Sequence, residues 1–515
     1  MTRSSTFSRA ALCAAALALG IAGCSGGTSP GGSGPAAGGG VLTVATAEEV
    51  KTVDPALAYD TWSTAVVHAC TRRLVDYDMQ GQIVPDLAER WDISEDGKVY
   101  TFALRKDAKF SDGTPIQAKH FQAAIERVKN PDTASPGADF YRGIDSLETP
   151  DEHTLVVVLG QPDPTLLNVL GLTFAAPIPE GESAAKPPAS GPYQVESFEQ
   201  GARAVLSRNP HDPRASGMVE RIVVQMNVEE SLQRTRFQNG EVDLLPAVPP
   251  MDYARIMAMP SEKDNVAQGV VNQTWYFGMN TRKAPWNDPR VRHAALLAIN
   301  RARHVDIAGP GQVANGILPP HVPGYDPERK LPEPDPEQAR RLLAEAGYPS
   351  GLPASMKSTM WLASTPQYRR HAEAIQSDLQ AVGIPVELRA VSFGEYLTGY
   401  KQKADCWYGG WYPDFPDAGN FLEPVLHGRS IRPGGPNVAR YDNPKVNALL
   451  DLAHTMPRGE KRQALYRQAE DQILLDLPWI PLYFEVETRY FRDGVRGVTV
   501  HPVWRQMLTG ISKGG

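Results

Sequence analysis

Residues 96–105 read Asp-Gly-Lys-Val-Tyr-Thr-Phe-Ala-Leu-Arg, and this stretch decides the first layer of the fold. Tyr100, Phe102 and Leu104 alternate with less apolar residues, which is the period of a strand that buries one face. The Asp96-Gly97 dipeptide before them favours a tight hairpin turn. We therefore predict a strand that follows a hairpin turn and lies half-buried in a sheet.

Strands and helices are marked on both sides of this stretch. Val41–Ala45 and Thr154–Leu159 are short apolar runs that favour strands. Asp335 can cap a helix that begins at Pro336 and ends before Gly347. This mixture of strand and helix predicts an α/β body. Further helices are expected over residues 63–75, from Asp288-Pro289 onward, and over residues 367–382.

The length and charge of the chain limit the classes of function. Its 515 residues are too many for one ordinary core, so two or three packed units are expected. With 42% hydrophobic and 22% charged residues, the composition is that of a folded globular protein. The net charge is −7 and no run of Lys or Arg stands out, so we expect no nucleic acid partner.

The N-terminus has the features of an export signal. Arg3 and Arg9 provide a positive segment, and residues 10–22 form an apolar run that is too short to span a bilayer. The run leads into Ile21-Ala22-Gly23-Cys24, which resembles a bacterial lipobox whose cysteine receives the lipid. A plain signal peptide followed by a chance cysteine is the alternative.

The segment after this cysteine is expected to be a flexible tether. Residues 24–40 consist almost wholly of Gly, Ser, Pro and Ala, which cannot build a core. We expect residues 1–23 to be removed as a lipoprotein signal peptide. The chain would then be anchored through Cys24 on the extracytoplasmic face of the cell membrane, with the lipid as its only membrane contact.

Two cysteines remain once Cys13 is removed and Cys24 is lipidated. Cys70 and Cys406 are far apart in sequence, and in an exported protein they could form a disulfide or stay as two buried thiols. The sequence leaves both open. It contains no CxxC or Cys/His ligand spacing, so neither a structural metal nor a cofactor is expected.

Motifs spread over nearly the whole mature chain carry a family resemblance. They include Ser190-Gly191-Pro192-Tyr193, Gly240-Glu241-Val242-Asp243 and Asp335-Pro336-Glu337-Gln338-Ala339, with further matching segments at residues 53–63, 73–78, 85–113, 280–301 and 410–422. In this order they resemble the family 5 extracellular solute-binding proteins of ABC importers, which bind dipeptides, oligopeptides or nickel.

The resemblance implies a two-lobed α/β fold like that of periplasmic binding proteins of type II, cluster C. Lobe I would comprise residues 41–275 and 484–515, with an extra subdomain at about residues 76–185. Lobe II would comprise residues 276–483. A hinge motion of the two lobes would enclose the ligand in the cleft between them.

The motif Trp411-Tyr412-Pro413-Asp414 matches the Trp-x-x-Asp motif in which peptide binders of this family carry an acid for the ligand's α-ammonium. A buried ammonium needs a counter-charge, so the resemblance assigns that role to Asp414. Asp417 is the second candidate, although the corresponding family residue more often caps the following helix. Ala418 stands where the family usually has Pro, which would loosen this loop.

Aromatic residues near this motif are expected to line the pocket, because rings give a large contact area with little loss of entropy. Gly410 would let the ligand backbone approach closely. Ordinary core packing is the alternative for each ring. The rings in question belong to Tyr59, Trp62, Tyr276, Trp407, Trp411 and Tyr412.

Two further contacts are left open. Asn280 would bond either the ligand or the backbone of the hinge. The ligand's carboxylate would need a cation, and no motif selects among Arg369, Arg429, Arg432 and Arg440.

The predicted function is that of a monomeric binding protein, not an enzyme, that captures short peptides and delivers them to the permease and ATPase subunits of an importer. The chain lacks GxSxG and HExxH, so a secreted hydrolase is a remote alternative. The nearer alternative is the same fold binding a sugar, a metal chelate or haem. A surface role without transport is the third.

Overall fold

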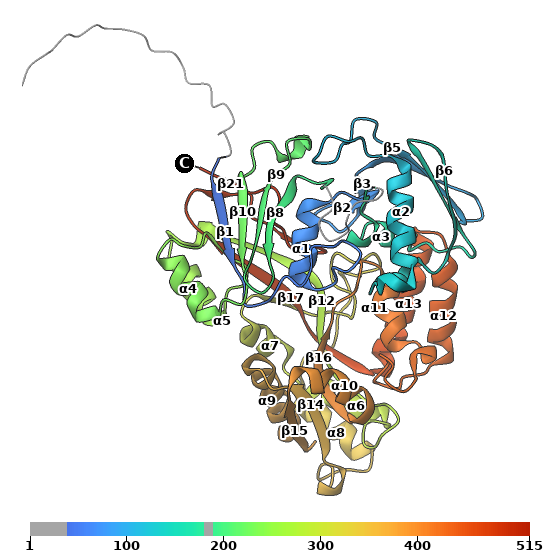
Figure 1. The fold of residues 1–515 in the computed structure, drawn as a ribbon. Helices are drawn as coiled ribbons and strands as arrows, with labels where there is room; N and C mark the ends of the chain where they lie inside the picture. The colour runs from blue at the N-terminus through green and yellow to red at the C-terminus, as the bar shows by residue number, and fades with distance from the viewer. Residues whose placement is uncertain (1–38, 180–188, 515) are drawn as a thin grey trace, which may run out of the picture. The chain divides into compact units, whose positions relative to one another are not determined.

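An 11-stranded mixed sheet organises the chain in the computed structural model, which describes residues 39–179 and 189–514 (Figure 1). These residues all belong to the unit Gly38–Gly515. The predicted signal peptide, the predicted lipidation site Cys24 and the tether up to residue 38 lie outside the described residues. The strands pair in the order β15-β14-β16-β12-β17-β11-β1-β10-β9-β8, with β13 beside β17.

The strands of this sheet come from distant parts of the sequence, and the predicted strand at Val41–Ala45 is confirmed as β1. Strands from the first half of the chain form one end of the sheet, and strands from the second half form the other. The remaining bounds are β8 Tyr193–Glu199, β9 Arg203–Arg208, β10 Arg221–Gln225, β11 Leu244–Leu245, β12 Val266–Met279, β13 Gly311–Val313, β14 Ser358–Ala363, β15 Val386–Val391, β16 Cys406–Trp411 and β17 Trp479–Phe491.

Two long antiparallel strands, β12 and β17, join these two ends of the sheet. Their pairing runs from Val266 opposite Tyr490 to Gly278 opposite Trp479. At one end β17 pairs with β11, and at the other end β12 pairs with β16. The pairing shifts register between Val270 and Thr274, so the two strands are irregular near their middle.

A separate four-stranded antiparallel sheet contains the hairpin predicted at residues 96–105. Strand β5 (Val99–Leu104) buries Tyr100, Phe102 and Leu104 and leaves the alternate residues half-buried, as predicted. Gly97 has φ +69° in the turn before it, a conformation that favours glycine. The strands pair in the order β4-β5-β7-β6, with β4 at Ala88–Ile93, β6 at Ile144–Asp151 and β7 at Thr154–Leu159, and helix α2 (Ala118–Lys129) shares their core.

Three of the predicted helices are confirmed with their predicted starts or ends. Helix α8 (Pro336–Glu345) begins after Asp335, whose side chain accepts a hydrogen bond from the Gln338 N–H. Helix α6 (Pro289–Ala298) begins after Asp288 in the same way. Helix α9 (Pro366–Ala381) fills the third predicted segment. Proline at the first helical position and an acid or hydroxyl cap are therefore sufficient local signals here.

The first helix is shorter than predicted. Helix α1 (Thr61–Cys70) ends where Thr71 takes an extended backbone, with φ −130° and ψ 151°. The Leu74 carbonyl accepts hydrogen bonds from the N–H groups of Asp86 and Ala88 at 3.2 and 3.0 Å. The residues after Cys70 therefore form hydrogen bonds to another segment instead of helical ones. This pairing continues as strand β2 (Val75–Tyr77) against strand β3 (Ile83–Pro85).

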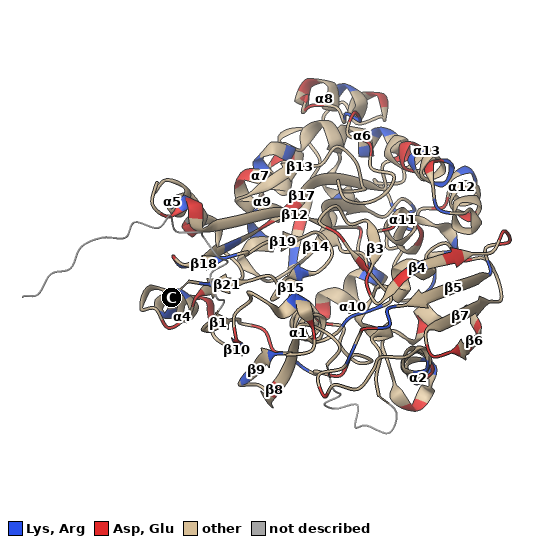
Figure 2. Cartoon of the chain, turned by 90° about the horizontal axis from the view of Figure 1, so that it is seen from above, with Lys and Arg blue, Asp and Glu red and all other residues tan. Residues whose placement is uncertain are grey.

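Acidic and basic residues are interspersed along the outer helices, as Figure 2 shows for α8, α12 (Pro444–Thr455) and α13 (Glu460–Asp476). The strands of the large sheet carry few charges by comparison. Within the part of the chain that the structure describes, no helix combines the length and the apolar character needed to cross a bilayer.

The disulfide that the sequence left open is not formed. Cys70 and Cys406 are both free and buried. Cys70 packs in the core beneath β1, β9 and β10, whereas Cys406 packs in the core around α6, α8 and α9. The two thiols therefore belong to different cores, and burial raises the pKa of each thiol well above its ordinary value.

A buried histidine pair joins helix α7 (Arg301–Ala308) to α9. His304 Nδ1 lies 3.0 Å from His371 Nδ1, and both side chains are fully buried. Burial, together with the charge that the partner ring would carry, lowers the pKa of His304 to about 3. Burial also lowers the pKa of His371 to about 4. The folded protein therefore keeps both rings neutral in mildly acidic solution.

This pair makes the fold sensitive to acid. Below pH 6.5, the ordinary histidine pKa, these two residues bind protons in the unfolded chain but not in the folded chain. The free energy of unfolding therefore falls as the pH falls from about 6.5 to 4. Each histidine contributes a slope of up to about 1.4 kcal/mol per pH unit. We predict that the double variant His304→Gln, His371→Gln loses less unfolding free energy than the wild type between pH 7 and 4.5 in urea titrations. Equal losses in the two proteins would contradict this account.

Candidate ligand-binding site

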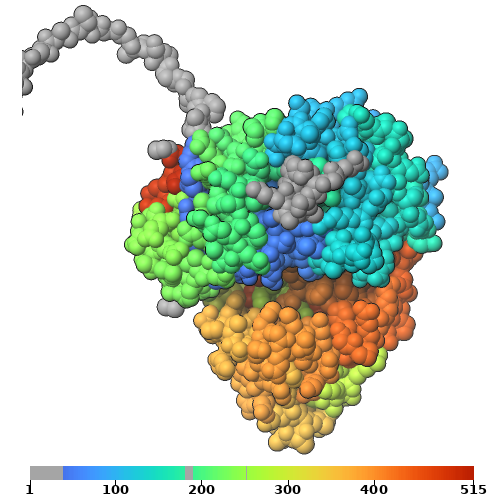
Figure 3. All heavy atoms as spheres, viewed as in Figure 1, coloured from blue at the N-terminus to red at the C-terminus, as the bar shows by residue number. Residues whose placement is uncertain are grey.

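A groove runs along the surface where the first half of the chain, blue to green, meets the second half, yellow to orange (Figure 3). The predicted acid Asp414 belongs to the second half, in the loop between β16 and helix α11 (Ala418–Leu426). Tyr59 belongs to the first half, just before α1. The Tyr59 hydroxyl donates a hydrogen bond of 2.6 Å to Asp414 Oδ1, so these two predicted site residues meet where the halves face each other.

The two acids of the loop have different roles. Asp417 accepts a hydrogen bond from the Gly419 N–H at 2.9 Å and caps α11. It also binds Arg462 through two contacts of 2.6 and 2.9 Å, and it is 1% exposed. Asp417 is therefore committed to structure, and the cap forms although Ala418 replaces the proline usual in the family.

Asp414 has no such cation. Its N–H donates to Asn420 Oδ1 at 2.9 Å, and Asn420 Nδ2 lies 3.4 Å from Asp414 Oδ2. Within residues 39–179 and 189–514, no Lys, Arg or His forms an ion pair with its half-buried carboxylate. The loop thus fixes one carboxylate oxygen through Tyr59 and leaves the negative charge without a counter-charge.

Tyr59 keeps its proton while it contacts this carboxylate. Burial and the neighbouring charge of Asp414 together raise the pKa of Tyr59 well above its ordinary value. The ring is still 56% exposed, so a ligand can reach it. Tyr59 therefore acts as a neutral hydrogen-bond donor on an accessible surface.

Trp411 and Tyr412 lie directly before Asp414 and are also held in place. Trp411 Nε1 donates to the Asn420 carbonyl at 3.0 Å. Tyr412 donates to the Val503 carbonyl at 2.7 Å, and the Arg505 guanidinium lies 5.0 Å from its ring centroid. Tyr412 is 36% exposed. The structure thus brings together four of the predicted site residues: Tyr59, Trp411, Tyr412 and Asp414.

The other three predicted rings are packed in protein cores. Trp62, Tyr276 and Trp407 are each at most 3% exposed. Tyr276 stacks on Trp479 with ring centroids 3.6 Å apart, and Trp407 packs closely against Gly278. For these rings the structure favours the core-packing alternative.

Gly410 and Asn280 both contact other parts of the protein. A Cβ on Gly410 would lie 2.9 Å from Gln273 Nε2, so the glycine makes room for a side chain of β12. Asn280 donates to the Ala404 carbonyl at 3.4 Å and accepts from the Arg282 N–H at 3.1 Å. Of the two partners left open for Asn280, the structure shows backbone.

The candidate arginines for a ligand carboxylate mostly have partners of their own. Arg429 binds Glu423 at 2.6 Å and Asp451 at 2.7 Å. Arg440 donates to two backbone carbonyls, and Arg369 lies 3.9 Å from Glu373. The geometry therefore selects none of these three.

Sequence reasoning missed Gln273, Glu485 and Arg505, which lie near Trp275 and Tyr412. Trp275 Nε1 donates to Glu485 Oε2 at 2.8 Å, and Arg505 covers the Tyr412 ring. One signal could have found the acid, because Glu485, Glu487 and Arg489 occupy every second position of β17. Charges at that spacing in a central strand indicate a polar face.

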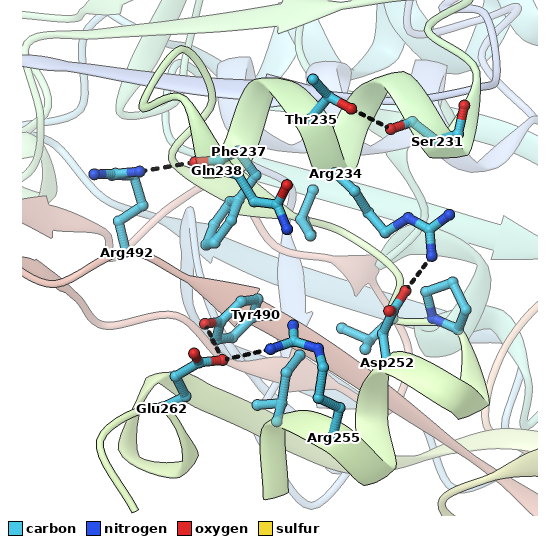
Figure 4. A pocket seen from close by; sticks show the side chains of 14 residues that line it. Ser231, Arg234, Thr235, Phe237, Gln238, Asp252, Arg255, Glu262, Tyr490 and Arg492 are labelled. Atoms are coloured by element: carbon cyan, nitrogen blue, oxygen red, sulfur yellow. Dashed lines mark hydrogen bonds and ion pairs between the residues drawn. The ribbon is translucent and has the colours of Figure 1, made fainter. Parts of the chain in front are cut away.

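A second hollow, of about 560 Å³, lies between helices α4 (Glu230–Gln238) and α5 (Pro250–Met257) (Figure 4). It contains none of the predicted site residues. Its cations are already bound: Arg234 to Asp252 at 2.6 Å, Arg255 to Glu262 at 3.4 Å and Arg492 to the Phe237 carbonyl at 2.8 Å. We therefore assign the candidate site to the groove around Asp414. Nowhere in the described residues do three or more His, Cys, Asp or Glu gather as metal ligands.

Known proteins resemble this chain over most of its length. The model described as "Bacterial extracellular solute-binding proteins, family 5 Middle" matches residues 82–432. The glutathione-binding protein GsiB of Salmonella choleraesuis is 30% identical over 484 residues, covering 90% of this chain and 92% of that protein. Heme-binding protein A of Haemophilus influenzae is 29% identical over 484 residues, covering 86% of each.

A solved structure shares the fold. The ABC transporter-associated periplasmic binding protein DppA from Helicobacter pylori, in complex with the peptide STSA, matches with a TM-score of 0.74 and 25% identity. The match covers 93% of this chain and 99% of that chain. It confirms the predicted α/β, two-lobed periplasmic-binding-protein fold.

The different roles of the two loop acids can be tested through stability. We predict that Asp417→Ala lowers the free energy of unfolding by about 3–5 kcal/mol, because it leaves Arg462 buried without its partner. Asp414→Asn, the matched change three residues away, is expected to cost less than about 1 kcal/mol. Urea titrations measure both. A larger loss for Asp414→Asn than for Asp417→Ala would reverse the assignment.

Proposed function

Because the chain belongs to the family 5 bacterial extracellular solute-binding proteins of ABC importers, we propose that it captures short peptides by their free α-amino group and passes them to a permease. The members of this family bind transported solutes and are not enzymes. The ammonium of the peptide would lie against Asp414 in the groove. The permease and its ATPase would then receive the peptide from the monomeric binding protein.

The observation that carries this proposal is the unpaired carboxylate of Asp414. A carboxylate that is partly removed from water and has no cation is stabilised by any ligand that supplies one. An ammonium has three N–H donors and a full positive charge, so it fits this acceptor. Tyr59 already uses Oδ1, which leaves Oδ2 with only the long Asn420 contact.

The relatives support an amine-bearing ligand. One neighbour was solved with the peptide STSA, and one relative binds glutathione. Both ligands carry an α-ammonium. A relative that binds haem keeps that solute as the second candidate, but haem has no ammonium and would leave the charge of Asp414 unmatched.

We also propose that the protein acts outside the cytoplasm, anchored to the cell membrane through a lipid on Cys24. The support is the match of Ile21-Ala22-Gly23-Cys24 to a lipobox and the Gly/Ser/Pro-rich segment that follows it. An importer's binding protein must meet its solute on the outer side of the membrane, so the anchor and the proposed function agree.

The anchor can be tested by detergent partition. We predict that the wild type enters the detergent phase of Triton X-114 and that Cys24→Ala shifts it to the aqueous phase, because the acyl chains are then absent. Cys70→Ala serves as a control, since Cys70 is a buried thiol. A Cys24→Ala protein that stays in the detergent phase would exclude a lipid on Cys24.

The peptide assignment can be tested with one ligand pair and one variant. We predict that the wild type binds a free-amine tetrapeptide such as Ser-Thr-Ser-Ala and binds its N-acetylated form at least 30-fold more weakly by calorimetry. Asp414→Asn should weaken binding of the free-amine peptide by about 2–5 kcal/mol, because the ammonium then lacks its counter-charge. Asp107→Asn, an exposed acid of the loop after β5, is the control.

Two results would contradict the proposal. Unchanged affinity of Asp414→Asn for the free-amine peptide would remove the ammonium contact. Thermal stabilisation by haem, a metal chelate or an oligosaccharide, with none from peptides, would assign the groove to another solute.

A further inference from the structure

A second acid, Glu485, lies on the crossover strand β17 close to the Asp414 loop. Its Oε2 accepts a hydrogen bond of 2.8 Å from Trp275 Nε1. Trp275 pairs with Gly410 across β12 and β16, and Gly410 is four residues before Asp414. The Glu485 side chain is 23% exposed, so it is largely withdrawn from water but still open to a ligand.

The carboxylate of Glu485 is poorly matched by the protein. Among the described residues it accepts one hydrogen bond, from Trp275, and its nearest cation is Arg505 at 3.9 Å. Arg505 contacts Glu487 much more closely, and Arg489 also binds Glu487. Both arginines therefore bind Glu487, whereas Glu485 has only the longer contact with Arg505.

The pKa values reflect this uneven sharing. Although burial favours the neutral form of Glu487, Arg505 and Arg489 hold the pKa of Glu487 at about 2. For Glu485 burial outweighs the attraction of Arg505, so its pKa is raised. Glu487 is therefore the neutralised member of the cluster, and Glu485 is the member that lacks stabilisation.

An acceptor without a donor lies close to Gly410. The Oε1 atom of Gln273 is buried and has no hydrogen-bond partner in the described chain. The amide of this side chain lies over Gly410, next to the Trp275 ring. Buried amide oxygens are nearly always hydrogen-bonded in folded proteins, and a ligand donor would satisfy this one.

Other carboxylates lie within electrostatic reach of this cluster. Tyr412 lies within electrostatic reach of Asp414, Glu485 and Glu487, with Arg505 on its ring. Glu48 lies within electrostatic reach of Arg505, Glu487 and Asp60.

We propose that Glu485 and Gln273 form a second cation-binding position in the groove, so that the preferred ligand is a short peptide with a Lys or Arg side chain as well as a free α-ammonium. This rests on the proposed function, in which Asp414 binds the α-ammonium. The cationic head of that side chain would supply the counter-charge that Glu485 lacks and a donor for Gln273.

The test compares matched peptides on one protein. Lys-Ala-Ala, Ala-Lys-Ala and Ala-Ala-Lys are titrated by calorimetry against the same peptides with Gln in place of Lys. The wild type should bind at least one Lys peptide 10-fold or more tightly than its Gln counterpart. Glu485→Gln should abolish that preference and leave affinity for the Gln peptides within about threefold of the wild type, and Gln273→Leu should reduce the preference.

Controls distinguish a failure of this inference from a failure of the proposed peptide-binding function. Glu95→Gln, an exposed acid of the β4–β5 turn, should keep the Lys preference. Thermal unfolding without peptide shows whether Glu485→Gln is folded. If the wild type binds Gln peptides through Asp414 but shows no preference for Lys, or if Glu485→Gln keeps the preference, Glu485 serves only to balance Arg505 and the inference is wrong. If no free-amine peptide binds, the proposed function fails and this inference with it.

Discussion

The pairing of β12 with β17 is the constraint on which the rest of this structure depends. The two strands carry the backbone hydrogen bonds of one sheet from the first half of the chain into the second. Neither strand can leave this pairing without exposing a row of buried amide groups. The halves on either side are therefore tied by two strands, and any relative motion between them must pass through these strands. The register shift near Val270 places the irregularity in this joint.

The same two strands explain where the charged groups lie. On β17 the acids Glu485 and Glu487 lie on one face, and Trp275 of β12 donates a hydrogen bond to Glu485. Burying acids at such a place is costly unless cations accompany them. The protein supplies Arg489 and Arg505, and both concentrate on Glu487. Among the described residues, Asp414 and Glu485 have no close cation, whereas Asp417 forms a two-contact ion pair with Arg462. Incomplete pairing therefore distinguishes the acids facing the groove from the acid that holds the loop.

The sequence predicted the parts of the fold that local chemistry determines. Asp335 with Pro336 determines where α8 begins, and the alternation of Tyr100, Phe102 and Leu104 determines which face β5 buries. The end of α1 could not be predicted, because the residues after it pair with residues more than ten positions away, as Leu74 does with Asp86 and Ala88. The sequence also could not show which aromatic rings are exposed. Tyr276 and Trp407 are aromatic like Tyr59 and Tyr412, and only the three-dimensional packing decides which of them is buried. Asp414 was predicted through a motif, whereas the surroundings of Glu485 depend on Trp275 and Arg505, which no spacing in the sequence connects to it.

The contact between Tyr59 and Asp414 has a consequence for how a ligand would be held. The hydroxyl belongs to one half and the carboxylate to the other, so their hydrogen bond joins the halves across the groove. A carboxylate has about four acceptor positions, and Tyr59 uses one of them. Under the proposed function an ammonium can therefore bind Oδ2 without displacing Tyr59, so the two donors can occupy the carboxylate together. Closure and ligand binding would then share one acceptor, which is a direct physical way for occupancy of the groove to favour the closed arrangement that a transporter recognises.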